Sequence, residues 1–311
     1  MKVVLPALAR PLVEARMPHD LELCWFTSAD EAAAMAVDAD IAWADTQRSE
    51  DTADIIAQAA RLKWLSTIRA GLDALPLDLL RERGTIVTNG MGLNAETVAD
   101  YAVMGVLVAA KRFDEVVRLA DRHQWTLDAP GRVELSGSRA LVIGYGTIGR
   151  MIGDRLTAFG VEVVGATRSG RDRTLSPDQW RGRLGAFDWV VLAAPSTGET
   201  RAMIGADELA AMKPGAWLIN IARGDMIDNA ALIEAIEKRR IAGAFLDPTD
   251  PEPLPPDDPL WSAPNVIHSM HLAGRSQMSM FRRGAELFVR NLAAFREERP
   301  MENVVDLGAG Y

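Results

Sequence analysis

The chain has 311 residues, of which 48% are hydrophobic and 25% are charged, and its formal net charge is −9. These proportions are typical of a soluble globular protein, and the length favours two domains over one. The acidic balance argues against nucleic acid and against a membrane surface as partners, because both favour a basic face. No apolar run approaches the roughly 20 residues of a membrane span, and the single cysteine, Cys24, cannot form an internal disulfide. These features together predict a cytoplasmic protein.

The N-terminal part alternates short strand-like runs with helical ones. Strands are expected at residues 2–5, 21–26, 40–43, 62–67 and 85–88, and helices at 29–37, 52–60 and 76–83. Such alternation indicates a parallel sheet with helices on both faces. A long helical segment is then expected from Ala95 to about Arg122, and its small and apolar residues favour tight packing or a subunit contact.

The same alternation resumes from Arg139. Six strands with helices between them suit a doubly wound dinucleotide-binding domain, and they are expected at 140–143, 161–166, 189–193, 217–221, 242–246 and 266–268. Residues 247–259 are dense in proline and predict an ordered active-site loop, with a disordered linker as the alternative. A last helix at about 276–296 would return the chain to the first domain.

A glycine-spaced turn follows the strand at 140–143. Gly144, Gly146 and Gly149 have the spacing G-x-G-x-x-G, and residues 150–159 are helical in pattern. In a dinucleotide-binding loop, the first glycine permits the turn, the second lets the backbone approach a pyrophosphate, and the third lets the helix pack on the strand. The N–H groups of the helix start would then face the phosphates. The alternative is a glycine turn that binds nothing.

The end of the next strand, Thr167-Arg168-Ser169, bears on the choice of cofactor. An NAD-preferring domain usually has Asp or Glu there, which accepts hydrogen bonds from the ribose 2′-OH. Here that acid is missing, whereas a guanidinium and two hydroxyls would hold a 2′-phosphate, with Arg171 and Arg173 close behind. The sequence therefore favours NADP(H) over NAD(H). The alternative is that Arg168 is an ordinary exposed arginine.

Three polar side chains of the C-terminal half form a usable catalytic set: Arg223, Glu252 and His271. Because ligands gather at the carboxyl ends of parallel strands, we expect these groups to converge on one crevice. A histidine exchanges a proton near neutral pH, a carboxylate beside it orients the ring and favours its charged form, and an arginine clamps a substrate carboxylate and polarises a carbonyl. Taken singly, each is more simply a surface or capping residue. His268 and His271 without a third ligand nearby make a poor metal site, so no metal is expected.

Several motifs resemble those of the D-isomer-specific 2-hydroxyacid dehydrogenases. They are APSTGETR at 194–201, MKPGAWLINIARG at 212–224, NAALIEAI at 229–236 and AGAFLD at 242–247. The resemblance extends from about Leu62 to Asp306, beginning with RAGLD at 69–73 and TNGMGLNAETVAD at 88–100, and it is weaker before Leu62. The combination is far more specific than the glycine turn alone.

The resemblance implies an α/β fold of two doubly wound parallel-sheet domains with the active site in the cleft between them. Residues 1–98 and 275–311 would form a flavodoxin-like substrate domain, and residues 99–274 a Rossmann-like NAD(P)-binding domain. The implied reaction is hydride transfer between the nicotinamide and C2 of a 2-oxo or D-2-hydroxy acid. Family habit also implies a homodimer.

The resemblance assigns roles to individual residues. Arg223 and Glu252 would be catalytic with His271 rather than His268, because the Leu-Ala-Gly after His271 matches the family's ending. The substrate would contact Arg223, His271 and the N–H groups of Ala70 and Gly71. Arg69, beside these N–H groups, either adds positive charge or is an ordinary surface residue. The cofactor set would be Gly144, Gly146, Thr147, Ile148, Gly149, Thr167, Arg168, Ser169, Pro195, Thr200, Ile221, Asp247 and Gly274, with Asp247 at the nicotinamide carboxamide.

Three positions depart from the family pattern. Pro248 stands where a valine usually follows the aspartate, Met270 stands where a proline usually precedes the histidine, and Asp100 replaces a common glutamate. The first two are expected to reshape the cleft locally, and the third to be structural.

The favoured function is reduction of a small 2-oxo acid such as glyoxylate or hydroxypyruvate, since a preference for NADPH suits the reducing direction. One alternative is a sibling enzyme of the phosphoglycerate or phosphite dehydrogenase kind. The other is a non-enzymatic NAD(P)-sensing protein that gates a protein interaction, against which the intact Arg–Glu–His set argues.

Overall fold

The computed structural model describes residues 1–46, 48–72, 75–275 and 277–308. The chain divides into two compact units, Met1–Asn94 with Ser276–Tyr311 and Ala95–Arg275, here called the first and the second unit. The boundaries expected from the sequence were 98/99 and 274/275. Each unit has its own parallel sheet, so the predicted α/β class with two doubly wound sheets is confirmed.

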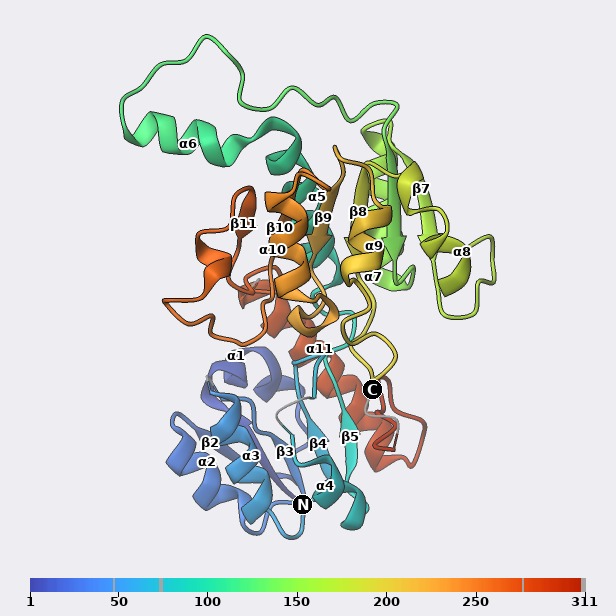
Figure 1. Ribbon diagram of the computed structural model, residues 1–311. Coiled ribbons are helices and arrows are strands. Elements are labelled where there is room, and N and C mark those ends of the chain that lie inside the picture. The colour runs from blue at the N-terminus through green and yellow to red at the C-terminus, as the bar shows by residue number, and fades with distance from the viewer. Residues whose placement is uncertain (47, 73–74, 276, 309–311) are drawn as a thin grey trace. The chain divides into compact units, whose positions relative to one another are not determined.

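The first unit is built on a five-stranded sheet with the order β2-β1-β3-β4-β5, in which every pair is parallel (Figure 1). Its strands are β1 (Lys2–Pro6), β2 (Glu22–Phe26), β3 (Ile41–Trp43), β4 (Trp64–Ser66) and β5 (Ile86–Thr88). Its helices are α1 (Arg10–Val13), α2 (Ala29–Ala36), α3 (Ser49–Gln58), α4 (Leu77–Glu82) and α11 (Gln277–Arg296), with 3-10 turns at Ala7–Ala9 and Glu14–Arg16.

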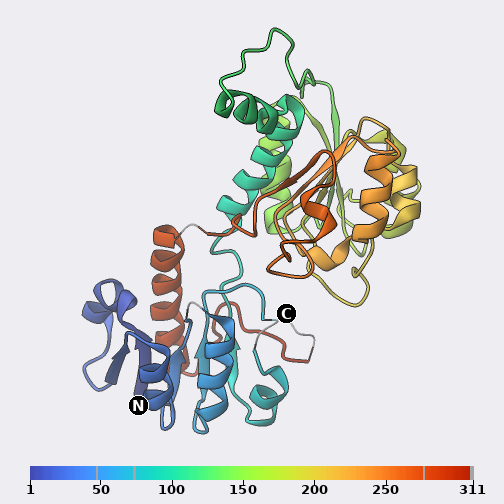
Figure 2. The same cartoon turned by 60° about the vertical axis from the view of Figure 1, so that its left-hand side comes forward.

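Successive side chains of these strands point to opposite faces of the sheet, where they form two apolar clusters, one on each face. Val4 and Leu65 pack with α2, α3 and α4, whereas Val3 and Trp64 pack with α1 and α11. Helices thus cover both faces of this sheet (Figure 2). On the second face, the buried Phe288 of α11 stacks 5.0 Å from Trp64, centroid to centroid. The C-terminal helix therefore completes the core of the first unit.

The second unit is built on a six-stranded parallel sheet with the order β11-β10-β9-β8-β6-β7. Its strands are β6 (Arg139–Ile143), β7 (Glu162–Ala166), β8 (Trp189–Leu192), β9 (Trp217–Asn220), β10 (Gly243–Leu246) and β11 (Val266–His268). Its helices are α5 (Ala95–Lys111), α6 (Phe113–Asp121), α7 (Thr147–Ala158), α8 (Pro177–Arg181), α9 (Ala206–Ala211) and α10 (Asn229–Glu237), with 3-10 turns at Leu184–Ala186, Gly224–Met226 and Pro259–Trp261.

This sheet is covered on both faces. Ala140 and Val142 of β6 pack in a cluster with α5 and α7, and Leu141 and Ile143 pack in a second cluster with α8, α9 and α10. The strand order reverses at β6, which has β7 on one side and β8 on the other. In open α/β sheets, such a switch point opens a crevice at the carboxyl ends of the strands.

The long helical segment expected from Ala95 to about Arg122 is helical over nearly all of this range, but it consists of two helices. The chain breaks at Arg112, whose φ of 47° is left-handed, so that α5 and α6 are separate helices. The Arg112 guanidinium is held by Asp114, by Glu115 and by the side-chain oxygen of Asn265, and it lies 5.7 Å from the centre of the Trp217 ring. These contacts hold a backbone conformation that costs a non-glycine residue about 1–3 kcal/mol.

Beyond the break, α6 and residues 122–130 extend away from the sheet of the second unit (Figure 1), and the chain returns to the core at the buried Leu135. No residue of α6 is buried. None of the helices in the described part of the chain is both long and apolar enough to cross a bilayer.

Candidate active site

The glycine turn connects β6 to α7 and has the close contacts that such a turn requires. Gly144 has a φ of 95°, and a Cβ there would lie 2.3 Å from the backbone nitrogen of Ala194. A Cβ on Gly149 would lie 2.2 Å from the carbonyl oxygen of Gly144. Gly146 is the N-cap of α7, and a Cβ there would meet nothing within 4 Å. The space over Gly146 therefore suits a phosphate close to the backbone.

Tyr145, between the first two glycines, fills the space behind this turn. A Cβ on Gly165 of β7 would lie 2.3 Å from its ring, and one on Gly153 of α7 would lie 2.5 Å from its hydroxyl oxygen. Burial raises the pKa of Tyr145, and the nearby Asp154 carboxylate adds to the rise. Sequence reasoning missed this residue, because Gly153 and Gly165 fall outside the G-x-G-x-x-G spacing.

A pocket of about 460 Å³ lies at the end of β7, where the sequence predicts a 2′-phosphate. It is lined by Tyr145, Arg150, Asp154, Thr167, Ser169, Arg171, Asp172 and Thr174. The lining thus contains Thr167 and Ser169 but not Arg168, which is exposed beside it. The guanidinium groups at the pocket belong to Arg150 and Arg171, and two carboxylates accompany them.

Pro195 and Thr200 belong to a loop that is bonded to the turn after β9. The Thr200 hydroxyl donates to the carbonyl oxygen of Pro195 at 2.9 Å, and the Ser196 hydroxyl donates to the Asp225 carboxylate at 2.8 Å. Asp225 lies two residues after Arg223, so the loop expected at the cofactor and the turn with the predicted catalytic arginine are held together. Sequence reasoning missed Asp225, although its position two residues after Arg223 was a signal.

The turn that carries Arg223 is organised by Asn220, the fully buried last residue of β9. The Asn220 side chain donates to the carbonyl oxygen of Arg223 at 2.8 Å and accepts from the N–H of Ala222 at 3.0 Å. A Cβ on Gly224 would lie 2.0 Å from the carbonyl carbon of Thr249. Only glycine permits this approach, which brings the Arg223 turn against the proline-rich loop that carries Glu252.

Glu252 and His271 are in direct contact. Nδ1 of His271 lies 2.8 Å and 3.1 Å from the two carboxylate oxygens of Glu252, and the Thr249 N–H donates to the same carboxylate at 3.1 Å. The His271 side chain is 44% exposed and that of Glu252 is 39% exposed, so a substrate can reach them. Because Nδ1 faces the carboxylate, Nε2 is the nitrogen that remains to exchange a proton with a substrate.

The backbone of His271 is held by Asp247, which is 2% exposed at the end of β10. The Asp247 carbonyl oxygen accepts from the His271 N–H at 2.7 Å. The Asp247 carboxylate accepts from the Ser269 hydroxyl at 2.7 Å, from the Leu272 N–H at 2.9 Å and from the Ala273 N–H at 3.2 Å. The residue that the sequence assigned to the nicotinamide carboxamide therefore also holds the histidine turn.

Ser269 connects this network to α5. Its hydroxyl is hydrogen-bonded to Tyr101. Burial raises the pKa of Tyr101, and the nearby Asp247 charge raises it further. The hydrogen bond with Ser269 lowers the pKa in part. Sequence reasoning missed both Ser269 and Tyr101; the hydroxyl two residues before His271 was the signal for Ser269.

His268 has a different environment from His271. Its Nε2 lies 2.9 Å from the carbonyl oxygen of Leu260, and its ring lies 4.9 Å from that of Trp261, centroid to centroid. In the described part of the chain, no cluster of three or more His, Cys, Asp or Glu side chains has an arrangement that would hold a metal ion.

The predicted carboxylate-binding turn of the first unit follows β4. The Asn89 side chain donates to the carbonyl oxygen of Ala70 at 3.0 Å. Among the described residues, the N–H groups of Ala70 and Gly71 have no acceptor. Two adjacent N–H donors without an internal partner suit an anionic ligand.

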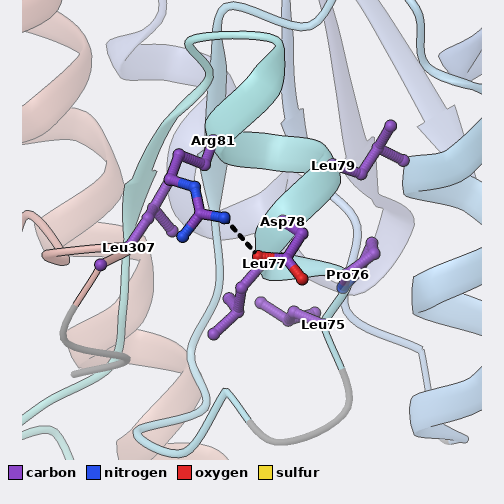
Figure 3. A pocket seen from close by; sticks show the side chains of 8 residues that line it. Leu75, Pro76, Leu77, Asp78, Leu79, Arg81 and Leu307 are labelled. Atoms are coloured by element: carbon purple, nitrogen blue, oxygen red, sulfur yellow. Dashed lines mark hydrogen bonds and ion pairs between the residues drawn. The ribbon is translucent and has the colours of Figure 1, made fainter.

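A larger cavity of about 640 Å³ also lies in the first unit, along α4 and Leu307 (Figure 3). Asp78 and Arg81, which line it, form an ion pair at 2.6 Å. None of the residues that the sequence predicts for the site lines this cavity.

Comparison with known proteins identifies the family. Residues 103–273 match the sequence profile of the "D-isomer specific 2-hydroxyacid dehydrogenase, NAD binding domain". The chain belongs to the D-isomer-specific 2-hydroxyacid dehydrogenases. The glycine turn, Arg223, Glu252 and His271 all lie inside the matched range.

Individual members of this family are similar over most of the chain. A glyoxylate reductase of Korarchaeum cryptofilum is 32% identical over 82% of this chain and 79% of its own length. A solved NADPH-dependent glyoxylate/hydroxypyruvate reductase of Sinorhizobium meliloti superposes with a TM-score of 0.80 at 26% identity, covering 98% of each chain. A D-3-phosphoglycerate dehydrogenase of Archaeoglobus fulgidus is 28% identical over 82% of this chain, which spans only 49% of that relative.

Two departures from the family pattern have a structural explanation. Asp100 of α5 accepts from Nε of Arg155 of α7 at 2.7 Å, which supports the structural role expected for it. Met270 has a φ of 56° and His271 a φ of 53°. Proline is locked near −65°, so the proline of other family members does not fit this turn as it is folded here.

We therefore expect Met270→Pro to disrupt the histidine turn, whereas Met270→Gly should leave it intact, because glycine adopts positive φ without strain. The proline variant should lose at least about tenfold in kcat, given the sensitivity of catalysis to small misplacements. Steady-state kinetics of both variants with NADPH and glyoxylate would check this. Equal activity of the two variants would contradict the left-handed turn.

Proposed function

We propose that this protein is an NAD(P)-dependent reductase of a small 2-oxo acid such as glyoxylate or hydroxypyruvate, acting in reverse on the D-2-hydroxy acid. The observation that carries the proposal is the Glu252–His271 pair, which leaves Nε2 of an exposed imidazole for a substrate. Membership of a family of 2-hydroxyacid dehydrogenases supports the reaction class. We propose a cytoplasmic location on the basis of composition alone.

The chain's own residues supply binding and proton transfer. Arg223 binds the substrate carboxylate and stabilises negative charge on the carbonyl oxygen, and the N–H groups of Ala70 and Gly71 add donors to the same carboxylate. His271 donates the proton from Nε2 to that oxygen, and Glu252 holds the ring through Nδ1. When bound, the nicotinamide dinucleotide supplies the hydride.

We assign the cofactor to the glycine turn, where the backbone of Gly146 is open and the start of α7 offers N–H donors. NADP(H) is favoured over NAD(H) because Arg171 lines the pocket at the end of β7, with the exposed Arg168 beside it. Asp154 and Asp172 line the same pocket and partly offset this charge. The Sinorhizobium meliloti relative is described as NADPH-dependent.

A phosphoglycerate dehydrogenase is the alternative within the family. The distinguishing substrate group is a phosphate, which requires cations beyond the one that binds the carboxylate. Near the predicted carboxylate turn the candidate cation is Arg69, and its guanidinium is already engaged with Asp45 and with the carbonyl oxygen of Thr46. This favours a substrate without phosphate. A non-enzymatic NAD(P) sensor is the remaining alternative, and turnover of any 2-oxo acid would exclude it.

The homodimer is proposed from exposed apolar side chains on the segment that extends from the second unit. Trp125 and Leu127 are 93% and 97% exposed, and Phe113 of α6 is 56% exposed. Large apolar side chains exposed along one segment are typical of a protein–protein contact. A second copy of the chain is the partner that family habit implies.

His271→Ala should lower kcat by about 100- to 10,000-fold, the usual contribution of a general acid. The affinity for NADPH should stay the same, because the predicted cofactor contacts are made by other residues than His271. Steady-state kinetics and a fluorescence titration of NADPH would measure the two effects. His268→Ala is the matched control. If turnover survives in His271→Ala but not in His268→Ala, His268 and not His271 is the proton donor.

Arg171→Ala and Arg168→Ala should each raise the KM for NADPH by about tenfold, the loss expected for one charge-assisted hydrogen bond. The KM for NADH should not change, since NADH lacks the 2′-phosphate. Arg181→Ala of α8 is the control, because Arg181 is outside the pocket lining and pairs with Glu208 of α9 at 2.9 Å. Equal changes in both KM values would rule out a 2′-phosphate contact.

A double variant, Trp125→Ala with Leu127→Ala, should sediment as a monomer at micromolar concentration, because it removes the most exposed apolar side chains of the contact. Analytical ultracentrifugation of the variant and the unaltered protein would show this. Phe159→Ala is the control, since Phe159 is 45% exposed on another element. A monomeric unaltered protein would refute the homodimer.

A further inference from the structure

The carboxylate of Asp45 is buried in the first unit and has no part in the reaction as described so far. Asp45 follows β3, and its side chain is 7% exposed. Burial raises the pKa of Asp45, and the hydrogen bond from Thr67 opposes that rise. A buried carboxylate is costly unless it has hydrogen-bond donors around it. Its partners therefore indicate what it is retained for.

Those partners belong to the strand before Asp45 and to the turn after β4. The Thr67 hydroxyl donates to Oδ1 at 2.6 Å, the Ile68 N–H donates to Oδ2 at 2.7 Å, and the buried Trp43 indole donates to Oδ2 at 2.9 Å. Nε of Arg69 lies 3.6 Å from Oδ1. Three consecutive residues of one turn thus contact a single carboxylate.

The N–H groups of this turn fall into two sets. The Thr67 N–H donates to the carbonyl oxygen of Thr88, the Ile68 N–H to Asp45, and the Arg69 N–H to the Thr67 hydroxyl at 3.1 Å. The next two, at Ala70 and Gly71, have no acceptor among the described residues. The turn is therefore anchored up to Arg69 and presents its donors just beyond the anchor.

The opposite side of the turn is held by the segment after β5. The Gly90 N–H donates to the carbonyl oxygen of Arg69 at 2.8 Å, and the Asn89 side chain donates to that of Ala70 at 3.0 Å. A Cβ on Gly90 would lie 1.9 Å from the carbonyl oxygen of Ile68, so the two segments are in close contact. The turn is thus held from two directions: by Asp45, which follows β3, and by Asn89 and Gly90, which follow β5.

We propose that Asp45 is a positioning residue for substrate binding: its carboxylate fixes the turn 67–71 so that the N–H groups of Ala70 and Gly71 point at one substrate carboxylate. It also keeps Arg69 paired, together with the Thr46 carbonyl oxygen, which accepts from Nη2 of Arg69 at 2.8 Å. The turn then recognises an anion through backbone donors. This inference rests on the proposed function.

Asp45→Asn tests the proposal with the smallest change of shape. An amide at this position offers one acceptor oxygen where the carboxylate offers two, so at least one donor of the turn loses its partner. The KM for glyoxylate should rise about tenfold, which corresponds to 1.4 kcal/mol, while kcat changes less than about threefold. The dissociation constant of NADPH should stay unchanged, because the glycine turn belongs to the second unit.

Asp40→Asn is the matched control. Asp40 precedes β3, is 8% exposed, and accepts from the N–H of Lys2 at 3.0 Å and from Nζ of Lys63 at 2.8 Å. It is a buried aspartate that flanks the same strand, at the end away from the turn. A merely structural role for Asp45 would make the two variants alike, with no separate effect on the KM for glyoxylate.

Thr67→Val and Thr67→Ser provide a second pair in case Asp45→Asn fails to fold. Valine removes the hydroxyl that links Asp45 to the Arg69 N–H, and serine keeps it. The KM for glyoxylate should rise in the valine variant. In the serine variant it should stay within about twofold of the value for the unaltered protein. An unchanged KM in both Asp45→Asn and Thr67→Val would overturn the proposal. Absence of turnover in the unaltered protein would instead contradict the proposed function.

Discussion

The buried carboxylate of Asp247 is the interaction on which the candidate site depends most. Asp247 follows β10; its carboxylate accepts from Ser269, Leu272 and Ala273, and its backbone carbonyl oxygen accepts from the His271 N–H. Without it, the turn from β11 would lose most of the acceptors that fix the imidazole opposite Glu252. A desolvated carboxylate with several N–H and O–H donors forms strong hydrogen bonds in a low dielectric. The histidine is therefore held by the backbone around it as well as by Glu252.

The same device recurs at the carboxyl ends of other strands. Asn220 ends β9 and caps the Arg223 turn, and Asp45 follows β3 and holds the turn after β4. These side chains are polar although they are buried, because the turns after parallel strands have N–H groups that the sheet no longer pairs. Apolar residues there would leave those donors unsatisfied. In each unit, buried polar side chains therefore lie mainly at the carboxyl edge of the sheet, where ligands of parallel sheets bind.

The sheets could be predicted from the sequence, and the turns only in part. Apolar runs separated by helical patterns specify β6 to β11 because a parallel sheet is buried on both faces. The break at Arg112 had no such signal: its left-handed φ comes from contacts with Asn265 and Trp217, which are distant in the sequence. Their chemistry and the resemblance to the family grouped Glu252 and His271 as a set, and the structure brings them to 2.8 Å. The sequence did not reveal the lining of the pocket at the end of β7, which includes Arg171 and not Arg168, because the left-handed residues Asp172 and Arg173 redirect that turn.

The chain is acidic overall, yet its predicted ligands are anions. The conflict is resolved locally, because backbone N–H groups and a few guanidinium groups provide the positive potential where it is needed. Gly146 and the start of α7 would face a pyrophosphate, and Ala70 with Gly71 would face a carboxylate, without adding any formal charge. Donors of this kind are fixed by the fold before a ligand arrives, so they need little reorganisation when charge develops. Such a site requires rigid turns, and the buried carboxylates of Asp45 and Asp247 provide that rigidity in the first and the second unit respectively.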